Sequence, residues 1–408
     1  MLAWLSLTDA QRKATIDAAE QQSGITAKAI EKDWWVTQTL RALFQGAYSK
    51  SIAFKGGTSL SKGWNLIARF SEDIDIALDS QVFGVAYDAN PSGGFVKRLK
   101  RQGCEFTSNK LRGDLEAQLA LIGVPPGMIS VIANPVPENH PDTDPQTLLM
   151  RYPSLYDPNE YIADEVKVEV SVRSQLMPSR AIQVQSFLDT YNPNPTFQEQ
   201  PFTVEIVLAH KTFLEKIFLL HEEFGKPERN NIRTKRMSRH LYDLYKMIRT
   251  GIDDKALQDH DLYDHLIEHR KQYNKITGID YQTHHHSTIS FIPIPGVLEE
   301  YRNDYATMKE QMIYEDAADF DDIIADLKFL LGRIRMKMEP RSLEEIIEAA
   351  IQQLKDEKIV TGATVEIPIE YKSDLSLQPS PINTNVIYSV KFIERQGNWQ
   401  FEAIAIQK

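Results

Sequence analysis

The chain has 408 residues, of which 42% are hydrophobic and 25% charged, and its formal net charge is −11. This composition is that of an ordinary globular protein with about two or three domains, and the acidic balance argues against a protein that coats nucleic acid. The single cysteine, Cys104, excludes an internal disulfide framework and a cysteine-based zinc cluster. Because no apolar run reaches the length of about 20 residues that crosses a bilayer, and no signal-peptide pattern opens the chain, we expect a cytoplasmic protein without membrane contact.

Two helices are predicted near the start of the chain. Thr8 and Thr26 are candidate N-caps of helices that end near Ser23 and Phe44. The apolar positions of the second helix have mostly helical spacing and include a pair of tryptophans. We expect both helices to pack against a sheet, with the tryptophans in the core.

Three elements are predicted around a glycine-rich turn: a strand over 51–55, a helix over 58–68 and a strand over 73–79. The helix follows the turn directly, so the N-terminus of the helix faces any ligand that is bound at the turn. The turn residues are candidates for a phosphate cradle, since glycine permits close backbone approach and hydroxyls add donors; they are Gly56, Gly57, Thr58 and Ser59. An ordinary strand-to-helix turn with a hydroxyl cap stays open as the alternative.

Two aspartates open the strand after this turn. Residues two apart in a strand point to the same face, so Asp73 and Asp75 share one face while Ile74 points into a core. Carboxylate oxygens suit Mg²⁺, and the backbone N–H groups of the preceding turn suit phosphate. The pattern therefore predicts a site for magnesium with a polyphosphate. Ser71 lies on the same predicted face, and Arg69 is expected to approach the site or to pair with an acid.

The alternation over 164–173 predicts a further strand, with valines on one face and Glu169 on the other. We expect a loop over 80–100 and an irregular stretch over 133–160 that is rich in Pro, Asn and Asp. The other predicted elements are a helix over 109–122, a strand over 181–187, helices over 203–224, 238–248, 254–276, 296–312, 318–337 and 342–357, and strands over 363–371, 384–394 and 398–406.

The order of two glycines, a spacer helix and Asp-x-Asp resembles the nucleotidyltransferase superfamily. With Arg69 and Ser71 before Asp73, it is similar to the bacterial abortive-infection nucleotidyltransferase toxins of the AbiEii/AbiGii type. The resemblance covers about residues 10–330. Its other segments are Glu31-Lys32-Asp33-Trp34-Trp35-Val36, Val168-Glu169-Val170, Glu215-Lys216 and Arg239-His240-Leu241-Tyr242-Asp243-Leu244.

The resemblance implies an α+β fold with a polymerase-β-like mixed sheet flanked by helices. We expect a nucleotidyltransferase catalytic domain with the N-terminal helical pair over residues 1–200 and a helical domain over 201–338. A small α+β module over 342–408 lies outside the resemblance, and its role is unknown.

Glu169 is the candidate third carboxylate, which joins Asp73 and Asp75 as a metal ligand or accepts the proton of the attacking group. A salt bridge from Glu169 to Lys167 or Arg173 is the alternative reading, and Glu165 is a weaker candidate for the same role.

The resemblance also implies catalytic roles for Lys216, as a cation for the triphosphate or pyrophosphate, and for Asp243, which orients that lysine or the nucleotide. Lys211 is a neighbouring alternative. The family usually has Asp where this chain has His240, so any role shared by two acids is in doubt. A basic cluster over 229–239 is either a solvated face or a dock for RNA or for the triphosphate.

By resemblance, the protein is a metal-dependent nucleotidyltransferase that uses Mg²⁺ and an NTP, releases pyrophosphate and acts as the toxin of a bacterial toxin–antitoxin pair. The expected acceptor is tRNA or another RNA, and the expected partner is a separate antitoxin protein; we expect no direct DNA binding. A nucleotidyltransferase for a small molecule such as an antibiotic, or a non-catalytic nucleotide-binding interaction protein, remains the alternative.

Overall fold

The computed structural model describes residues 2–157, 162–335, 364–370, 387–395 and 398–407. Its main sheet has seven strands in the order β3-β4-β5-β2-β1-β7-β6. The bounds of these strands are β1 Ile52–Lys55, β2 Ile74–Leu78, β3 Ser130–Ala133, β4 Gln146–Arg151, β5 Glu165–Ser171, β6 Ser179–Val184 and β7 Phe202–Val207.

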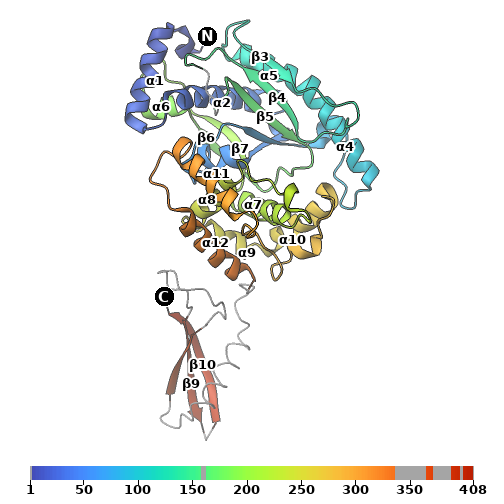
Figure 1. The fold of residues 1–408 in the computed structure, drawn as a ribbon, viewed down its shortest axis with the longest axis vertical. Helices are drawn as coiled ribbons and strands as arrows, with labels where there is room; N and C mark the ends of the chain where they lie inside the picture. The colour runs from blue at the N-terminus through green and yellow to red at the C-terminus, as the bar shows by residue number, and fades with distance from the viewer. Residues whose placement is uncertain (1, 158–161, 336–363, 371–386, 396–397, 408) are drawn as a thin grey trace.

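The sheet is mixed. β2 pairs antiparallel with β1 and parallel with β5, and β1 pairs parallel with β7. Helices flank the sheet (Figure 1), which confirms the expected α+β fold. The helices are α1 Asp9–Ser23, α2 Ala27–Gln45, α3 Gly56–Lys62, α4 Gly93–Phe106, α5 Arg112–Leu121, α6 Phe187–Tyr191, α7 Ala209–Phe224, α8 Ser238–Ile248, α9 Ile252–Gln258, α10 His260–His269, α11 Leu298–Gln311 and α12 Phe320–Arg335.

One core lies between the sheet and the N-terminal helices. The valines of β5 are buried on one face, as their alternation predicts, and the two tryptophans of α2 are fully buried with them. Thr8 caps α1 with a capping box, whereas the Thr26 side chain makes no cap bond to α2. The core face of the sheet is therefore determined by side chains that alternate along each strand.

A second core holds helices α7 to α12 together. These helices lie below the sheet in Figure 1. The second core also takes in Leu60 of α3, so the helix that follows the glycine turn is packed against it. Among the described residues, no helix is both long enough and apolar enough to span a membrane.

The prediction of one helix over 203–224 is wrong in its first part. Residues 202–207 form β7, and α7 begins only at Ala209. Phe202, Val204 and Ile206 are buried and alternate with more exposed residues, which is the period of a strand. β7 bonds to β6 and β1, so pairing with distant strands decides the conformation of this segment.

Other boundaries also differ from the prediction. α3 begins at Gly56 itself and ends at Lys62, soon before Asn65 adopts a left-handed φ of 52°, so the helix predicted over 58–68 is shorter and earlier. Asp73 precedes β2 instead of opening it. The helix predicted over 109–122 consists of a π-helical segment, Thr107–Leu111, followed by α5, and the helix over 254–276 divides into α9, α10 and a π-helical segment, Arg270–Asn274.

The stretch predicted to be irregular contains β4, and it begins at the last residue of β3; the two strands lie at one edge of the sheet. Near the end of the chain, the predicted strands are confirmed as an antiparallel sheet of β8 Thr364–Glu370, β9 Ile387–Arg395 and β10 Asn398–Gln407. The helix predicted over 342–357 lies outside the described residues, and the three-domain division remains a prediction.

Candidate active site

The register of three neighbouring strands places three charged residues in a row. Lys55 at the end of β1 is the partner of Asp75 on β2, and Asp75 is the partner of Glu169 on β5. Their strand neighbours Ile74 and Val168 are buried in the core on the opposite face. Three residues that are far apart in sequence therefore meet on the face of the sheet that does not carry the core.

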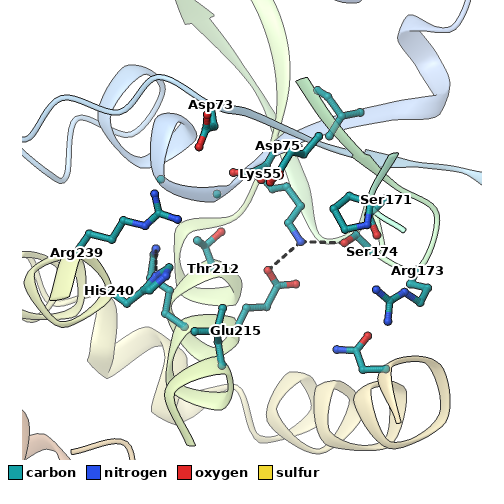
Figure 2. A pocket seen from close by; sticks show the side chains of 18 of the residues that line it. Lys55, Asp73, Asp75, Ser171, Arg173, Ser174, Thr212, Glu215, Arg239 and His240 are labelled. Atoms are coloured by element: carbon teal, nitrogen blue, oxygen red, sulfur yellow. Dashed lines mark hydrogen bonds and ion pairs between the residues drawn. The ribbon is translucent and has the colours of Figure 1, made fainter. Parts of the chain in front are cut away.

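These residues line a cavity of about 370 Å³ between the sheet and helices α7, α8 and α10. Figure 2 shows Asp73, Asp75 and Lys55 on one side and Arg239, His240 and Glu215 on the other. Of the residues predicted for the site, the cavity brings together Gly56, Gly57, Arg69, Ser71, Asp73, Asp75, Glu169 and Lys216, whereas Thr58, Ser59 and Asp243 do not line it.

The glycine turn and the Asp75 carboxyl are in direct contact. Gly56 has a φ of +77°, and a Cβ built there would collide with the Asp75 carboxyl group. A Cβ at Gly57 would lie 2.7 Å from Nη2 of Arg69 and 3.0 Å from Oγ of Ser71. Both glycines are therefore needed for space, and the first also for its backbone conformation.

The two hydroxyls after the glycines are used inside the protein. Thr58 donates to the carbonyl of Asp73 at 2.5 Å, and its Oγ1 lies 2.8 Å from Oγ of Ser71. Ser59 donates to the carbonyl of Gly56 at 2.8 Å. Both residues are buried, so they brace the turn against the segment that carries Asp73. Their contact with a phosphate remains a prediction.

Asp75 is in an unfavourable place for a negative charge. Burial raises its pKa to about 7, and the nearby carboxylates of Glu169 and Asp73 act in the same direction against the attraction of Lys55. Like charges directly opposite each other weaken a strand pair, so this arrangement costs stability. A cation bound among these carboxylates would remove that cost.

Glu169 also forms the salt bridge that is the alternative to its role as a metal ligand. Its Oε1 lies 2.5 Å from Nζ of Lys167, while Arg173 pairs with Asp144 instead. Glu165 pairs with Arg151 at 3.1 Å and does not line the cavity. The Glu169 carboxylate thus lines the cavity while it is held from one side by a lysine of the same strand.

Behind the cavity lies a buried cluster of charges. Arg69 donates to both oxygens of Asp243, from Nε at 2.7 Å and from Nη2 at 2.8 Å. Nζ of Lys216 lies 2.8 Å from Oδ2 of the same carboxylate and 3.4 Å from Nδ1 of His240. Although burial by itself would raise the pKa of Asp243, the two cations hold it well below its usual value.

His240 is the neutral neighbour of Lys216 in this cluster. Burial, followed by the charge of Lys216, holds its pKa well below the ordinary value, so the ring is neutral near neutral pH. A neutral imidazole accepts one hydrogen bond, and Nδ1 is within reach of Lys216. His240 can therefore keep a contact with the lysine, without the negative charge of an aspartate.

The basic cluster over 229–239 separates into two groups. Arg229, Arg233 and Arg236 form ion pairs with Glu300, Glu223 and Glu72. In contrast, Arg239 reaches toward the cavity and makes no hydrogen bond or ion pair with any residue that the structure describes (Figure 2). Its guanidinium group is thus the member of this cluster best placed to meet an anion in the cavity.

Other residues of the cavity are Lys55, which the sequence suggests as a phosphate contact, and Thr212 and Glu215, for which the sequence predicts no role. Lys55 is 3.5 Å from Oε2 of Glu215 and donates to Ser174 at 2.9 Å (Figure 2). Thr212 is 2% exposed, and its hydroxyl has no partner among the described residues. Thr212 and Glu215 are three apart on α7, so helical spacing gives the signal that would have placed them on one face. Lys211 does not line the cavity, because its amine is tied to two backbone carbonyls.

The Glu31-Lys32-Asp33 segment of α2 braces the site from the core side. Lys32 pairs with Glu72, the residue before Asp73, at 2.7 Å, and Asp33 pairs with Lys62 at the end of α3 at 2.6 Å. All four side chains of these ion pairs are almost fully buried. One helix therefore fixes both the helix that follows the glycine turn and the segment that carries the first aspartate.

The carboxylates of the cavity have the chemistry of a magnesium site but are not grouped as one. In the described parts of the chain, no three His, Cys, Asp or Glu side chains lie close enough together to hold a metal ion. Asp73, Asp75 and Glu169 nevertheless supply hard oxygen donors beside a turn suited to phosphate, and their mutual repulsion fits a bound cation. Their assignment as ligands remains a prediction.

A protein-family model matches most of this chain. The family model described as nucleotidyl transferase AbiEii toxin, type IV toxin–antitoxin system, matches residues 38–326. Among solved structures, the chain is similar to MenT4, a nucleotidyltransferase toxin from Mycobacterium tuberculosis H37Rv. The sequence identity is 16% over 85% of this chain and 99% of that chain, and the TM-score is 0.36. A comparison with curated proteins gave no match. Because the family model covers most of the chain, including the glycine turn and every cavity residue described above, the protein belongs to the AbiEii nucleotidyl transferase toxin family of type IV toxin–antitoxin systems.

Proposed function

We propose that this protein transfers a nucleotidyl group from an NTP to an RNA acceptor such as tRNA, with Mg²⁺ as cofactor and pyrophosphate as product. The observation that carries the proposal is the contact between the Gly56 turn and the Asp75 carboxyl, which sits in register with Glu169. A phosphate-binding turn and a pair of carboxylates thus share one cavity. As the toxin of a type IV pair, the protein would act opposite a separate antitoxin.

The charges of the cavity suggest how the donor lies. Arg239 of α8 and Lys216 of α7 line the cavity together with the glycine turn and Asp73, and they supply positive charge there. This part of the cavity suits the β- and γ-phosphates, which places the α-phosphate near Asp75. When bound, magnesium would offset negative charge on the phosphates during the transfer. Asp243 holds Arg69 and Lys216 and so acts as a positioning residue behind the cavity.

In the proposed reaction, an acceptor hydroxyl forms a bond to the α-phosphorus while the bond from that phosphorus to the bridging oxygen of pyrophosphate breaks. The hydroxyl proton must pass to a base. Asp75 and Glu169 are the candidates, because both carboxylates line the cavity in which the transfer would take place.

A non-catalytic nucleotide-binding role is disfavoured by the site itself. Glu169 and Lys216, which would be dispensable for simple binding, line the same cavity as Asp73 and Asp75. A small-molecule acceptor remains an outcome of the test below. The acids of the cavity favour a cationic drug, whereas the ion-paired arginines of the 229–239 cluster leave Arg239 as the main cation for RNA.

The test is incubation of the protein with Mg²⁺, total tRNA and each NTP labelled at the α-phosphate. We expect label on RNA with the wild type and none with Asp75→Asn. Asp321→Asn, which changes an exposed carboxylate on α12, is the matched control and should behave as wild type. Transfer that survives Asp75→Asn would refute the mechanism. Label on aminoglycosides or proteins but never on RNA would refute the acceptor alone.

A further inference from the structure

A second cavity of about 300 Å³ adjoins the first, and the two share the lining residues Arg173, Ser174, Gln175 and His269. The second cavity lies beyond the end of β2, where Leu78 and Asp79 line it. The motifs that mark the first cavity in the sequence do not extend to this one. A transfer reaction joins two substrates, so a second cavity that opens onto the first has an evident use.

Aromatic rings form one wall of the second cavity. Tyr87 stacks on Tyr273 with centroids 5.5 Å apart and planes 13° apart, and Tyr273 stacks on His269 at 4.6 Å and 18°. Tyr87 also lies 6.1 Å from His269 with planes 20° apart, so the three rings form a compact cluster, and His265 packs beside it at 6.4 Å from His269. Tyr273 and His269 are buried, whereas His265 is exposed and Tyr87 is 50% exposed. Few large hydrophobic side chains are so exposed among the described residues, and Tyr87 is the exposed tyrosine of this cluster.

The protein holds Tyr87 in this position. The hydroxyl of Tyr273 donates to the carbonyl of Asp88 at 2.6 Å and accepts from its backbone N–H at 3.2 Å. Asp88 follows Tyr87 directly, so the Tyr273 hydroxyl also fixes the loop that carries Tyr87. A platform fixed in this way loses little conformational entropy when a ligand stacks on it.

The polar groups around the rings suit a flat heterocycle. Nε2 of His269 lies 2.7 Å from the carbonyl of Arg173, and because a carbonyl only accepts, Nε2 carries the proton. Burial lowers the pKa of His269 to about 4, so the ring is neutral and Nδ1 is an acceptor. This nitrogen is buried without a partner among the described residues. Ser174 and Gln175 add further polar groups where the cavities join.

The charges of the second cavity disfavour a polycationic ligand. Its acid is Asp79, which caps a short helical turn by accepting from the N–H of Gln81, and its arginine, Arg173, is paired with Asp144. A wall of stacked rings with little free charge matches a nucleobase, which offers a π-face.

We propose that the second cavity is a nucleobase subsite in which the ring of Tyr87 stacks on a base. The proposal rests on the proposed function for its choice of ligands, because that reaction supplies two sources of a base: the donor NTP and the end of the RNA acceptor. The same stacking would recognise a base from the NTP or from the RNA, and binding measurements with each ligand distinguish the two sources.

The test measures equilibrium binding and does not depend on transfer. Wild type, Tyr87→Ala and Tyr87→Phe are titrated with each of the four NTPs and, separately, with a labelled single-stranded RNA that has a free 3′ end. Phe329→Ala, which removes another partly exposed aromatic ring on α12, is the matched control.

Tyr87→Ala is expected to weaken the binding of one class of ligand by about five- to a hundredfold, the range for removal of one stacking ring, while Tyr87→Phe and Phe329→Ala bind as wild type. Loss in the NTP titrations assigns the donor base, and loss in the RNA titration assigns an acceptor base. Changes below about twofold in both, or no binding of either ligand by the wild type, would overturn the subsite. Absence of transfer with this binding pattern intact would overturn the proposed function and leave the subsite standing.

Discussion

Asp75 on β2 lies directly opposite Glu169 on β5 as its partner in a parallel strand pair, and both side chains line the same cavity. Burial raises the pKa of Asp75 to about 7, the charge of Glu169 acts in the same direction, and Lys55 on the other side of Asp75 offsets only part of the shift. Two acids placed opposite each other in this way lower the stability of the fold, and a cation bound at the site can restore that stability. Four of the predictions below follow from the charges of this site, and one follows from the space around the glycine turn.

The first prediction concerns pH and the metal-free protein. The folded pKa of Asp75, about 7, lies above its ordinary value of 3.8, so between these values the folded state binds the proton more tightly than the unfolded state. Stability should therefore fall as the pH rises from about 4 to about 7 in EDTA and should level off above about 7. Asp75→Asn should remove part of this fall and melt about 2–4 °C above the wild type at the higher pH. Parallel melting curves for the two proteins would contradict the prediction.

A second prediction tests the contact between the turn and the acid. Gly56→Ala places a methyl group against the Asp75 carboxyl in a left-handed backbone, and we expect activity to fall by about a hundredfold or more. Gly24→Ala is the matched control, because Gly24 has a similar φ of +71° but no atom within 4 Å of the added carbon. If both variants lose similar stability but only Gly56→Ala loses activity, the contact between the turn and Asp75 is needed for activity. Equal activities of the two variants would show that this contact is not needed.

A third prediction addresses the buried cluster behind the cavity. Asp243→Asn leaves Arg69 and Lys216 without their shared anion, and loss of one partner of a buried pair costs about 3–5 kcal/mol. The pKa of Asp243 is depressed, so its contribution to stability is present above its unfolded value of 3.8 and is lost as the pH falls below it. Urea unfolding near pH 7 and near pH 3 should show a smaller difference between variant and wild type at the lower pH. A difference that grows on acidification would refute this account.

Arg239 supplies a fourth prediction. Since its guanidinium group has no partner among the described residues, Arg239→Gln should leave the melting temperature unchanged or slightly raised. If it meets the donor phosphates, KM for the NTP should rise about tenfold or more. Arg229→Gln, from the same basic segment but paired with Glu300 outside the cavity, should leave KM as in the wild type. Equal KM values for both variants would remove Arg239 from the donor site.

The fifth prediction concerns the brace from α2. Glu72→Gln breaks the buried pair with Lys32 next to Asp73, so both stability and activity should fall. Asp321→Asn, which breaks an exposed pair with Arg302, should leave the melting temperature unchanged within error. A wild-type rate in Glu72→Gln, measured well below its melting temperature, would show that the brace holds the fold together without positioning the site.

Local patterns predicted much of the fold. The alternation of β5, the N-cap at Thr8 and the helix over 238–248 are properties of short segments, and each is confirmed. Residues 202–207 were missed as a strand, because a short apolar run leading into a helix reads as part of that helix. The conformation of residues 202–207 is decided by the pairing of β7 with β6 and β1. Both of these strands are separated from β7 by other segments of the chain.

The candidate site divides in the same way. The sequence by itself determined the glycine turn and the side of the strand on which Asp75 points, since both follow from the geometry of a few consecutive residues. Only the tertiary structure decided that Asp243 pairs with Arg69 across 174 residues of chain, that Thr58 faces inward, and that Tyr87 stacks with Tyr273 and His269. The periodicity of a sequence indicates the direction in which a side chain points from its own helix or strand. The residue that this side chain contacts, and the extent to which it is desolvated, depend on how distant helices and strands pack.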